Sequence, residues 1–272
     1  MKIHREELNI NGFTKLGKVI SKTDLPIFLK KLYELSQQQI EKYGKDFLIE
    51  RNELESIRDL AQRDKIFVDL ICNERLNNFI DITLNNRAVI HSYNGIVTSP
   101  LKKSSDFLGF EYHRDNPFFN GIRTSIVVMI PLVDTTIENG STEVVPTTHL
   151  FEDKPSEDFL EKHSIPMEVP AGHAYCCDGA LWHRAGQNKS KSDRPLIAIK
   201  YTLAPFKQQV DYCQTSREII QDFPEIAKKR LGWEARVCQT VEEYMVPGNE
   251  RKFKSGNYIM DNTNVFKKVK DS

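Results

Sequence analysis

The sequence predicts a mainly β protein, a double-sheet jelly roll or barrel with α-helices on both flanks. Two observations predict it: a region of extended character from 87 to 205, and helical periodicity on either side of that region. Within 87–205, stretches rich in β-branched and aromatic residues alternate with Gly, Pro, Asn and Ser, as strands alternate with turns. Because no helical pattern separates them, they should pair into two packed sheets or a closed barrel. The stretches are AVIHSYNGIVTS, FLGFEYHRD, IRTSIVVMIPLV, STEVVP, IPMEVP, HAYCCDG and RPLIAIKYTLA.

The turns and flanks follow from local signals. Asn139-Gly140 and Ala171-Gly172 are the clearest tight turns. Thr23-Asp24 and Pro26 open a helix that Gly44 should end, because apolar residues recur within it at spacings of three and four. A second helical region covers roughly 62–84, with a break near Asn73. The stretch before the first helix, GFTKLGKVI, is typical of an edge strand, and the pattern after Pro205 is again helical.

These elements predict a single domain over 1–272, since no internal repeat or low-complexity linker divides the chain. A helical flank takes about 20–86, the β core about 87–205 and a C-terminal helical segment about 206–246. The last part, 247–272, is a polar tail.

The composition limits the classes of partner that we expect the chain to bind. The chain has 38 basic and 38 acidic residues, so its formal net charge is zero and no global field attracts nucleic acid or an anionic membrane. We therefore expect a small-molecule partner. The N-terminus lacks an apolar signal region, and the longest apolar run, IVVMIPLV, is too short to cross a bilayer, which predicts a cytoplasmic protein.

The cysteines argue against a disulfide framework and a structural zinc site. There are five, an odd number, and none has C-x-x-C spacing. Cys176 and Cys177 are adjacent on an expected strand, so their side chains should point to opposite faces and serve as small buried residues.

A His-x-Asp motif at 113–115 is the first candidate site. Roughly one His-x-Asp/Glu is expected by chance in this composition, and His4-Arg5-Glu6 at the terminus is discarded as such a match. His113 and Asp115 instead close an extended run, in which residues i and i+2 point to the same side. With His183 they would form the two-histidine, one-carboxylate set that binds Fe(II) and leaves coordination positions open.

Arg194 is the second candidate. It follows His183 by eleven residues and begins the strand RPLIAIKY, which should place its charge near the interior. A buried arginine needs an acidic partner, and a bound dicarboxylate can be that partner. The alternative is a structural ion pair with Asp193 or Asp178.

Together these motifs resemble the phytanoyl-CoA dioxygenase family of Fe(II)/2-oxoglutarate oxygenases, from about Gly12 to Trp233. The resemblance lies in HRD, IENGSTEVVPTTH, PAGHAYCCDGALWHRAGQNKSKSDRP and RLGW. It implies a double-stranded β-helix, the cupin-like form of the jelly roll. It also implies that His113, Asp115 and His183 bind iron, that Arg194 grips the distal carboxylate of 2-oxoglutarate, and that dioxygen is a second co-substrate.

Three further residues enter as co-substrate candidates by the same resemblance. Asn94 matches an amide on the strand before the motif, and Phe110 matches an aromatic residue packed against the first histidine, which requires a bend or bulge. Two residues after the distal histidine the family commonly has Ser, whereas this chain has Ala185, and Thr124 could supply the missing hydrogen bond. His149 corresponds to a structural turn.

The function implied is hydroxylation of a small-molecule C–H bond, with decarboxylation of 2-oxoglutarate to succinate, in secondary metabolism. A cupin-like metal-binding or sensing protein without turnover is the alternative, and it would not need Arg194. A zinc hydrolase would need a general base beside the metal-bound water, and no such carboxylate is evident near either histidine in the sequence.

Overall fold

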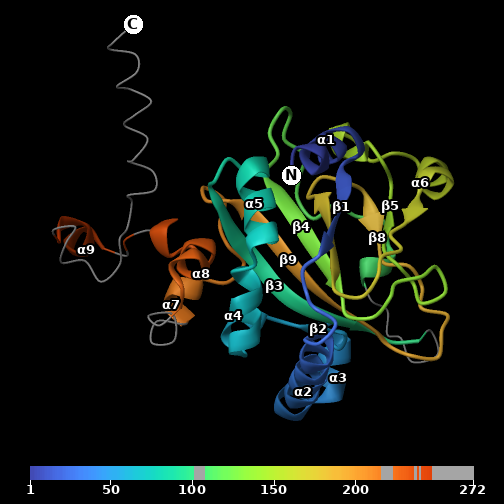
Figure 1. The fold of residues 1–272 in the computed structure, drawn as a ribbon, viewed down its shortest axis with the longest axis horizontal. Helices are drawn as coiled ribbons and strands as arrows, with labels where there is room; N and C mark the ends of the chain where they lie inside the picture. Colours follow the sequence, from blue (N-terminus) through green and yellow to red (C-terminus); the bar gives the residue numbers. More distant parts are fainter. Residues whose placement is uncertain (101–107, 216–222, 236–237, 239, 247–272) are drawn as a thin grey trace, which may run out of the picture.

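The computed structural model describes residues 1–100, 108–215, 223–235, 238 and 240–246. Two antiparallel sheets form its centre (Figure 1). The main sheet has the order β1 (Phe13–Lys18), β7 (His173–Asp178), β4 (Ser125–Pro131), β9 (Arg194–Leu203), β3 (Ala88–Thr98) and β2 (Ser56–Ile57). The small sheet has the order β6 (Ile165–Pro166), β5 (Glu143–Val144) and β8 (His183–Arg184).

The two sheets enclose a common apolar core. Val127 and Met129 of β4 pack with Tyr175 and Cys177 of β7 and with Val144 of the small sheet. We call the face of the main sheet that carries these side chains the inner face. The arrangement confirms the predicted mainly β jelly roll, in its double-stranded β-helix form, with helices on both flanks.

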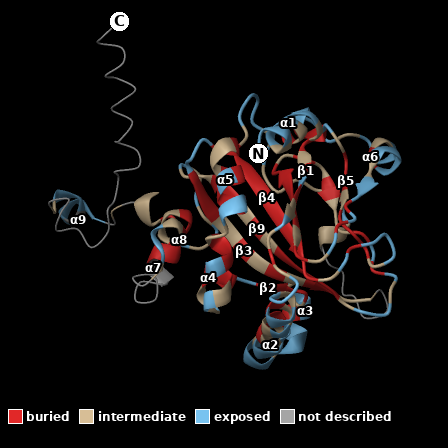
Figure 2. Cartoon of the chain, in the orientation of Figure 1, coloured by how far each residue is buried: buried red, intermediate tan, exposed pale blue. Residues whose placement is uncertain are grey.

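Helices cover the opposite, outer face of the main sheet. Side chains of β9 such as Ile197 and Tyr201 pack there against helical residues such as Leu32, Phe67 and Phe79 in a larger core. Figure 2 shows buried residues concentrated in the sheet and the exposed ones on the outer surfaces of the helices. The described residues as a whole form the helices α1 (Lys2–Asn11), α2 (Leu25–Tyr43), α3 (Lys45–Glu50), α4 (Lys65–Ile71), α5 (Glu74–Thr83), α6 (Glu157–His163), α7 (Tyr212–Thr215), α8 (Glu225–Arg230) and α9 (Val241–Met245), with 3-10 turns at Leu60–Gln62, Leu108–Phe110, Thr148–Leu150 and Trp233–Ala235. Of these, α6 lies beside the small sheet rather than on the outer face (Figure 1).

Several local predictions are confirmed. GFTKLGKVI contains the edge strand β1, and α2 ends at Gly44. The second helical region is divided at Asn73, whose side chain caps α5 by accepting a hydrogen bond from the Leu76 N–H. Both tight turns form, with Gly140 and Gly172 at positive φ. In the part of the chain that the structure describes, no helix is long and apolar enough to cross a membrane.

The cysteines also behave as predicted. Among the described residues no cysteine forms a disulfide, and Cys176 joins the outer core whereas Cys177 joins the inner one.

Two local predictions were wrong or incomplete, and one helix was not predicted. The unpredicted helix is α1 at the N-terminus, which is held by the buried side chain of Leu8. The described part of FLGFEYHRD, residues 108–115, is not a strand, because it meets only the two-residue strand β8 and pairs with it at a single bridge between His113 and His183. The helix expected after Pro205 is described only as the short α7 and α8, since 216–222 lie outside the described residues, as does the tail 247–272.

Candidate active site

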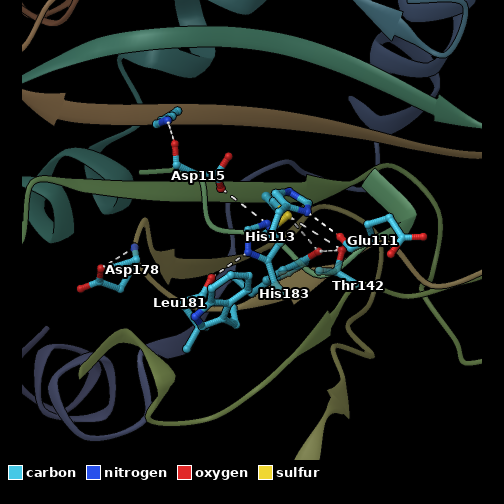
Figure 3. Close-up of polar contacts among 12 residues, drawn as sticks. Glu111, His113, Asp115, Thr142, Asp178, Leu181 and His183 are labelled. Atoms are coloured by element: carbon cyan, nitrogen blue, oxygen red, sulfur yellow. Dashed lines mark hydrogen bonds and ion pairs between the residues drawn. The ribbon is translucent and has the colours of Figure 1, made fainter. Parts of the chain in front are cut away.

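His113, Asp115 and His183 come together between the two sheets. One potential ligand atom from each lies within 4.8 Å of the other two (Figure 3). The backbones of His113 and His183 exchange two hydrogen bonds, with N···O distances of 2.9 and 3.1 Å. Asp115 follows two residues later, and its carboxylate lies 3.5 Å from Nε2 of His183. The three side chains therefore converge on a volume that one metal ion can fill.

Both imidazoles are oriented by backbone carbonyls. Nδ1 of His113 lies 2.8 Å from the Glu111 carbonyl oxygen, and Nδ1 of His183 lies 2.9 Å from that of Leu181. Each Nδ1–H can donate to its carbonyl, which leaves Nε2 as the metal-binding atom, the usual arrangement of ligating histidines. Burial lowers the pKa of His183, and the neighbouring His113 lowers it further against the opposing effect of Asp115. His183 is thus held in the neutral form that binds metal.

Arg194 is buried on the inner face with an incomplete set of partners. Its Nη2 donates to Oγ1 of Thr98 at 3.1 Å, on the adjacent strand β3. Its Nε and Nη1 have no hydrogen-bond partner among the described residues, and no described acidic side chain forms an ion pair with it. Asp178, one of the two alternatives from the sequence, pairs with Arg123 instead, at 2.7 Å. A buried guanidinium with unpaired N–H donors on two nitrogens can be satisfied by a carboxylate, so Arg194 fits the predicted 2-oxoglutarate site.

The three remaining co-substrate candidates lie at different places. Asn94 faces inward opposite Ala198, and in the amide orientation that satisfies its neighbours it accepts a hydrogen bond from Arg58 at 3.0 Å. Phe110 lines a separate pocket with Ala185 and Gln187.

Thr124 lies far from Arg194. Its carbonyl accepts a hydrogen bond from Thr202, eight residues beyond Arg194 on β9, which is roughly 26 Å along a strand. The structure therefore does not bring Thr124 to the carboxylate that Arg194 would hold.

Comparison with known proteins shows the family to which the chain belongs. A family model described as Phytanoyl-CoA dioxygenase (PhyH) matches residues 8–196. The chain belongs to the phytanoyl-CoA dioxygenase family. It is accordingly an Fe(II)/2-oxoglutarate-dependent oxygenase.

Relatives of this phytanoyl-CoA dioxygenase family member include bacterial and fungal proteins. The Mycobacterium tuberculosis protein Rv1501 is 27% identical over 256 residues, which cover 93% of this chain and 94% of Rv1501. Dioxygenase olcK of Penicillium canescens is 29% identical over 158 residues, which cover 57% of this chain and 50% of olcK. Among solved structures, the non-heme alpha-ketoglutarate-dependent carbocyclase SnoK from nogalamycin biosynthesis shares the fold, with a TM-score of 0.60 and 19% identity over 80% of this chain and 90% of SnoK.

One further residue of the site in this family member, Lys200, was not predicted from the sequence. Lys200 lies six residues after Arg194 on the same face of β9, and its Nζ donates to the backbone carbonyl of Asp115 at 2.6 Å. Burial lowers its pKa, and the Asp115 charge opposes that effect. The period of two along β9 could have found it, since even-numbered residues from Arg194 onward share the inner face.

The other basic residues beside the motifs have structural partners. Arg114 lies over the ring of Trp182, with 4.8 Å between its Cζ and the ring centroid, and donates to the Glu152 carbonyl. Arg184 pairs with Glu143 and Glu161. His149 lies 3.2 Å from the Asn9 carbonyl oxygen through Nε2, consistent with the structural turn expected for it.

Proposed function

We propose that this oxygenase hydroxylates a C–H bond of a small molecule and decarboxylates 2-oxoglutarate to succinate. His113, Asp115 and His183 would hold the iron, and Arg194 would bind the distal carboxylate of 2-oxoglutarate. The observation that carries the proposal is Arg194, buried with Nε and Nη1 unpaired on the face above which the triad lies. When bound, iron and 2-oxoglutarate supply the activation of dioxygen and the oxidising power that an unactivated C–H bond requires.

The residues of the chain supply orientation. Thr98 accepts a hydrogen bond from Nη2 of Arg194, which fixes the orientation of the guanidinium before any ligand arrives. The carbonyls of Glu111 and Leu181 fix the two imidazole rings in the same way. Such preorganisation lowers the entropic cost of assembling metal and co-substrate.

The surrounding side chains limit water near the metal. Val127, Met129 and Cys177 are buried on the inner face, and Tyr175 satisfies its hydroxyl by donating to Thr142 at 2.8 Å. An apolar wall of this kind strengthens the electrostatic interactions of the site and protects reactive species from side reactions.

The two alternatives from the sequence are less well supported. A metal-binding or sensing protein without turnover has no use for an unpaired, buried guanidinium. A zinc hydrolase would place a general base beside the metal-bound water. Among the described residues, the group that could hold a metal consists of His113, Asp115 and His183, with no second carboxylate. We place the reaction in secondary metabolism because SnoK, which shares the fold, comes from nogalamycin biosynthesis.

Succinate release tests the proposal without the natural substrate. The purified protein with Fe(II), 2-oxoglutarate and dioxygen should release succinate slowly, because these enzymes turn over part of the co-substrate uncoupled. His183→Ala and Arg194→Ala should abolish the release. Arg75→Gln should retain it, because Arg75 donates to the Leu16 carbonyl away from the site. Succinate release that persists in both site variants would refute the assignment.

A further inference from the structure

We propose that Lys200 determines substrate specificity by binding an acidic group, a carboxylate or a phosphate monoester, on a substrate with an apolar body. This inference rests on the proposed function, since it names the substrate class of the same site. The strand β9 carries two cations at well-separated positions. Arg194 stands at the start of the strand, and Lys200 stands on the same face six residues later, roughly 20 Å along the strand.

The two cations therefore serve different ends of the site. Arg194, beside Thr98, is placed for the co-substrate, and a single 2-oxoglutarate molecule is too short to engage both residues. Lys200 lies toward the other end of β9 and contacts the triad at the backbone carbonyl of Asp115. A ligand that approaches the metal from that side meets the Lys200 ammonium.

The pattern of exposure shows that this end of the inner face is open. Ser92, Asn94, Ala198 and Lys200 are all partly exposed, although β3 and β9 lie inside the main sheet. Outward-facing neighbours on the same strands, such as Tyr201, are buried. Side chains of inner strands remain exposed only where space lies above them. The space here adjoins the triad.

Lys200 has hydrogen-bonding capacity to spare. An ammonium has three donors, and among the described residues one is used, in the bond to the Asp115 carbonyl. Ser92 lies directly across from Lys200 on β3, and its hydroxyl makes no hydrogen bond among the described residues. Cross-strand partners have Cβ atoms about 5 Å apart, so one anionic group can contact both side chains. On the other side of Lys200, β4 presents the buried Val127, which suits an apolar substrate body.

The other cations near the motifs already have partners. Arg123 is paired with Asp178, Arg184 with Glu143 and Glu161, and Arg114 is held by backbone carbonyls. The Lys200 ammonium has no ion pair among the described residues. An incoming acid would therefore supply a charge partner rather than compete with one.

The alternative is that Lys200 has only a structural role, in which its hydrogen bond holds the Asp115 segment in place. Lys200→Gln separates the two roles, because a glutamine can still donate to the Asp115 carbonyl but carries no charge. Lys200→Arg keeps the charge. Lys15→Met is the matched control, since Lys15 is also a strand lysine that donates to a carbonyl, that of Glu168 at 2.9 Å, on the edge strand β1.

The experiment measures binding of octanoate, octyl phosphate and the neutral octanamide to the anaerobic Fe(II)·2-oxoglutarate enzyme by calorimetry. The visible band of the iron–keto acid complex is recorded in parallel. We expect the wild type, Lys15→Met and Lys200→Arg to bind at least one of the two acids about tenfold or more tightly than the amide, as a charge-assisted hydrogen bond predicts. Lys200→Gln should bring the preferred acid within about threefold of the amide while the band is unchanged. Which acid is preferred distinguishes the carboxylate from the phosphate.

The inference would be overturned if the wild type showed no preference for either acid, or if Lys200→Gln kept the preference. It would also be overturned if Lys200→Gln lost the keto acid band, because Lys200 would then have a structural role at the metal site. Ser92→Asp is an independent arm that does not depend on the folding of the Lys200 variants. A carboxylate opposite Lys200 should occupy the ammonium and abolish the preference. If the wild type forms no keto acid band at all, the proposed function fails, and that result is separate from the failure of this inference.

Discussion

His113 and His183 form a directly opposed backbone pair, each donating its N–H to the other's carbonyl at 2.9 and 3.1 Å. Their ring centroids are 4.4 Å apart. Two ligands from distant parts of the sequence are thereby fixed as neighbours by the backbone, independently of any metal. Changes in the backbone around either histidine should consequently alter metal affinity.

Gly12→Ala tests this dependence. Gly12 has φ +83°, and an added Cβ would lie 2.5 Å from Nδ1 of His149 and 2.6 Å from Cδ1 of Leu181, whose carbonyl orients His183. We expect a loss of about 2–4 kcal/mol in the free energy of unfolding, from backbone strain and overpacking together, and weaker metal binding. Denaturant unfolding and metal titration measure the two effects.

Gly44→Ala is the control for that substitution. Gly44 also has a positive φ, +84°, but its ψ of 141° differs from the ψ of 0° at Gly12, and nothing lies within 4 Å of an added Cβ. It should lose about 1–3 kcal/mol of unfolding free energy from backbone strain alone, with metal affinity unchanged. An equal loss of metal affinity in the two variants would show that the contact with Leu181 is unimportant.

Arg194→Lys should weaken 2-oxoglutarate binding by about 10- to 100-fold, the range expected for the loss of a hydrogen bond to a charged group. Lysine retains the charge but cannot present two parallel N–H groups. Iron affinity should stay the same, because Arg194 is not among the metal-binding set. Anaerobic titrations of both ligands measure the effect, and an equal loss of both affinities would mean that Arg194 has only a structural role.

Asp59 should make stability depend on pH. Burial raises the pKa of Asp59 to about 7 against the opposing effects of Arg63 and Gln62. In the unfolded chain an aspartate has a pKa of about 3.9, so between pH 4.5 and 6.5 the folded state holds a proton that the unfolded state has lost. This single group should lower the free energy of unfolding by at most about 1.4 kcal/mol for each pH unit of increase.

Asp59→Asn isolates that contribution. Asn is compatible with the left-handed backbone at this position, where φ is +59°, and it does not titrate. Urea unfolding of both proteins from pH 4.5 to 6.5 should show the difference in stability between Asp59→Asn and the wild type growing with pH. A difference that stays constant over this range would contradict the raised pKa.

The candidate site was predictable where its chemistry is local. The His-x-Asp spacing places two ligands near each other in any extended segment, and the expected inward direction of Arg194 followed from its place at the start of a strand. This explains why the two histidines, Asp115 and Arg194 could be singled out from the sequence before any contact was known.

The remaining features depend on long-range pairing, which periodicity does not encode. The register of Ser125 opposite Thr202 places Thr124 at the wrong end of β9 for Arg194. The segment before His113 has strand composition but finds only a two-residue partner, so it forms a 3-10 turn and a single bridge. The alternation of side chains along β9 places Lys200 on the same face as Arg194. Its role in the site, however, follows only from its contact with Asp115, which the sequence does not show.

Optical titration of the anaerobic protein tests the central claim most directly. With saturating Fe(II) and 2-oxoglutarate, the protein should develop the weak visible charge-transfer band of a keto acid bound to iron through two oxygens. The band should be absent in His183→Ala, and in Arg194→Lys it should require a much higher concentration of 2-oxoglutarate. Failure of the wild-type protein to form the band at saturating concentrations of both ligands would contradict the account.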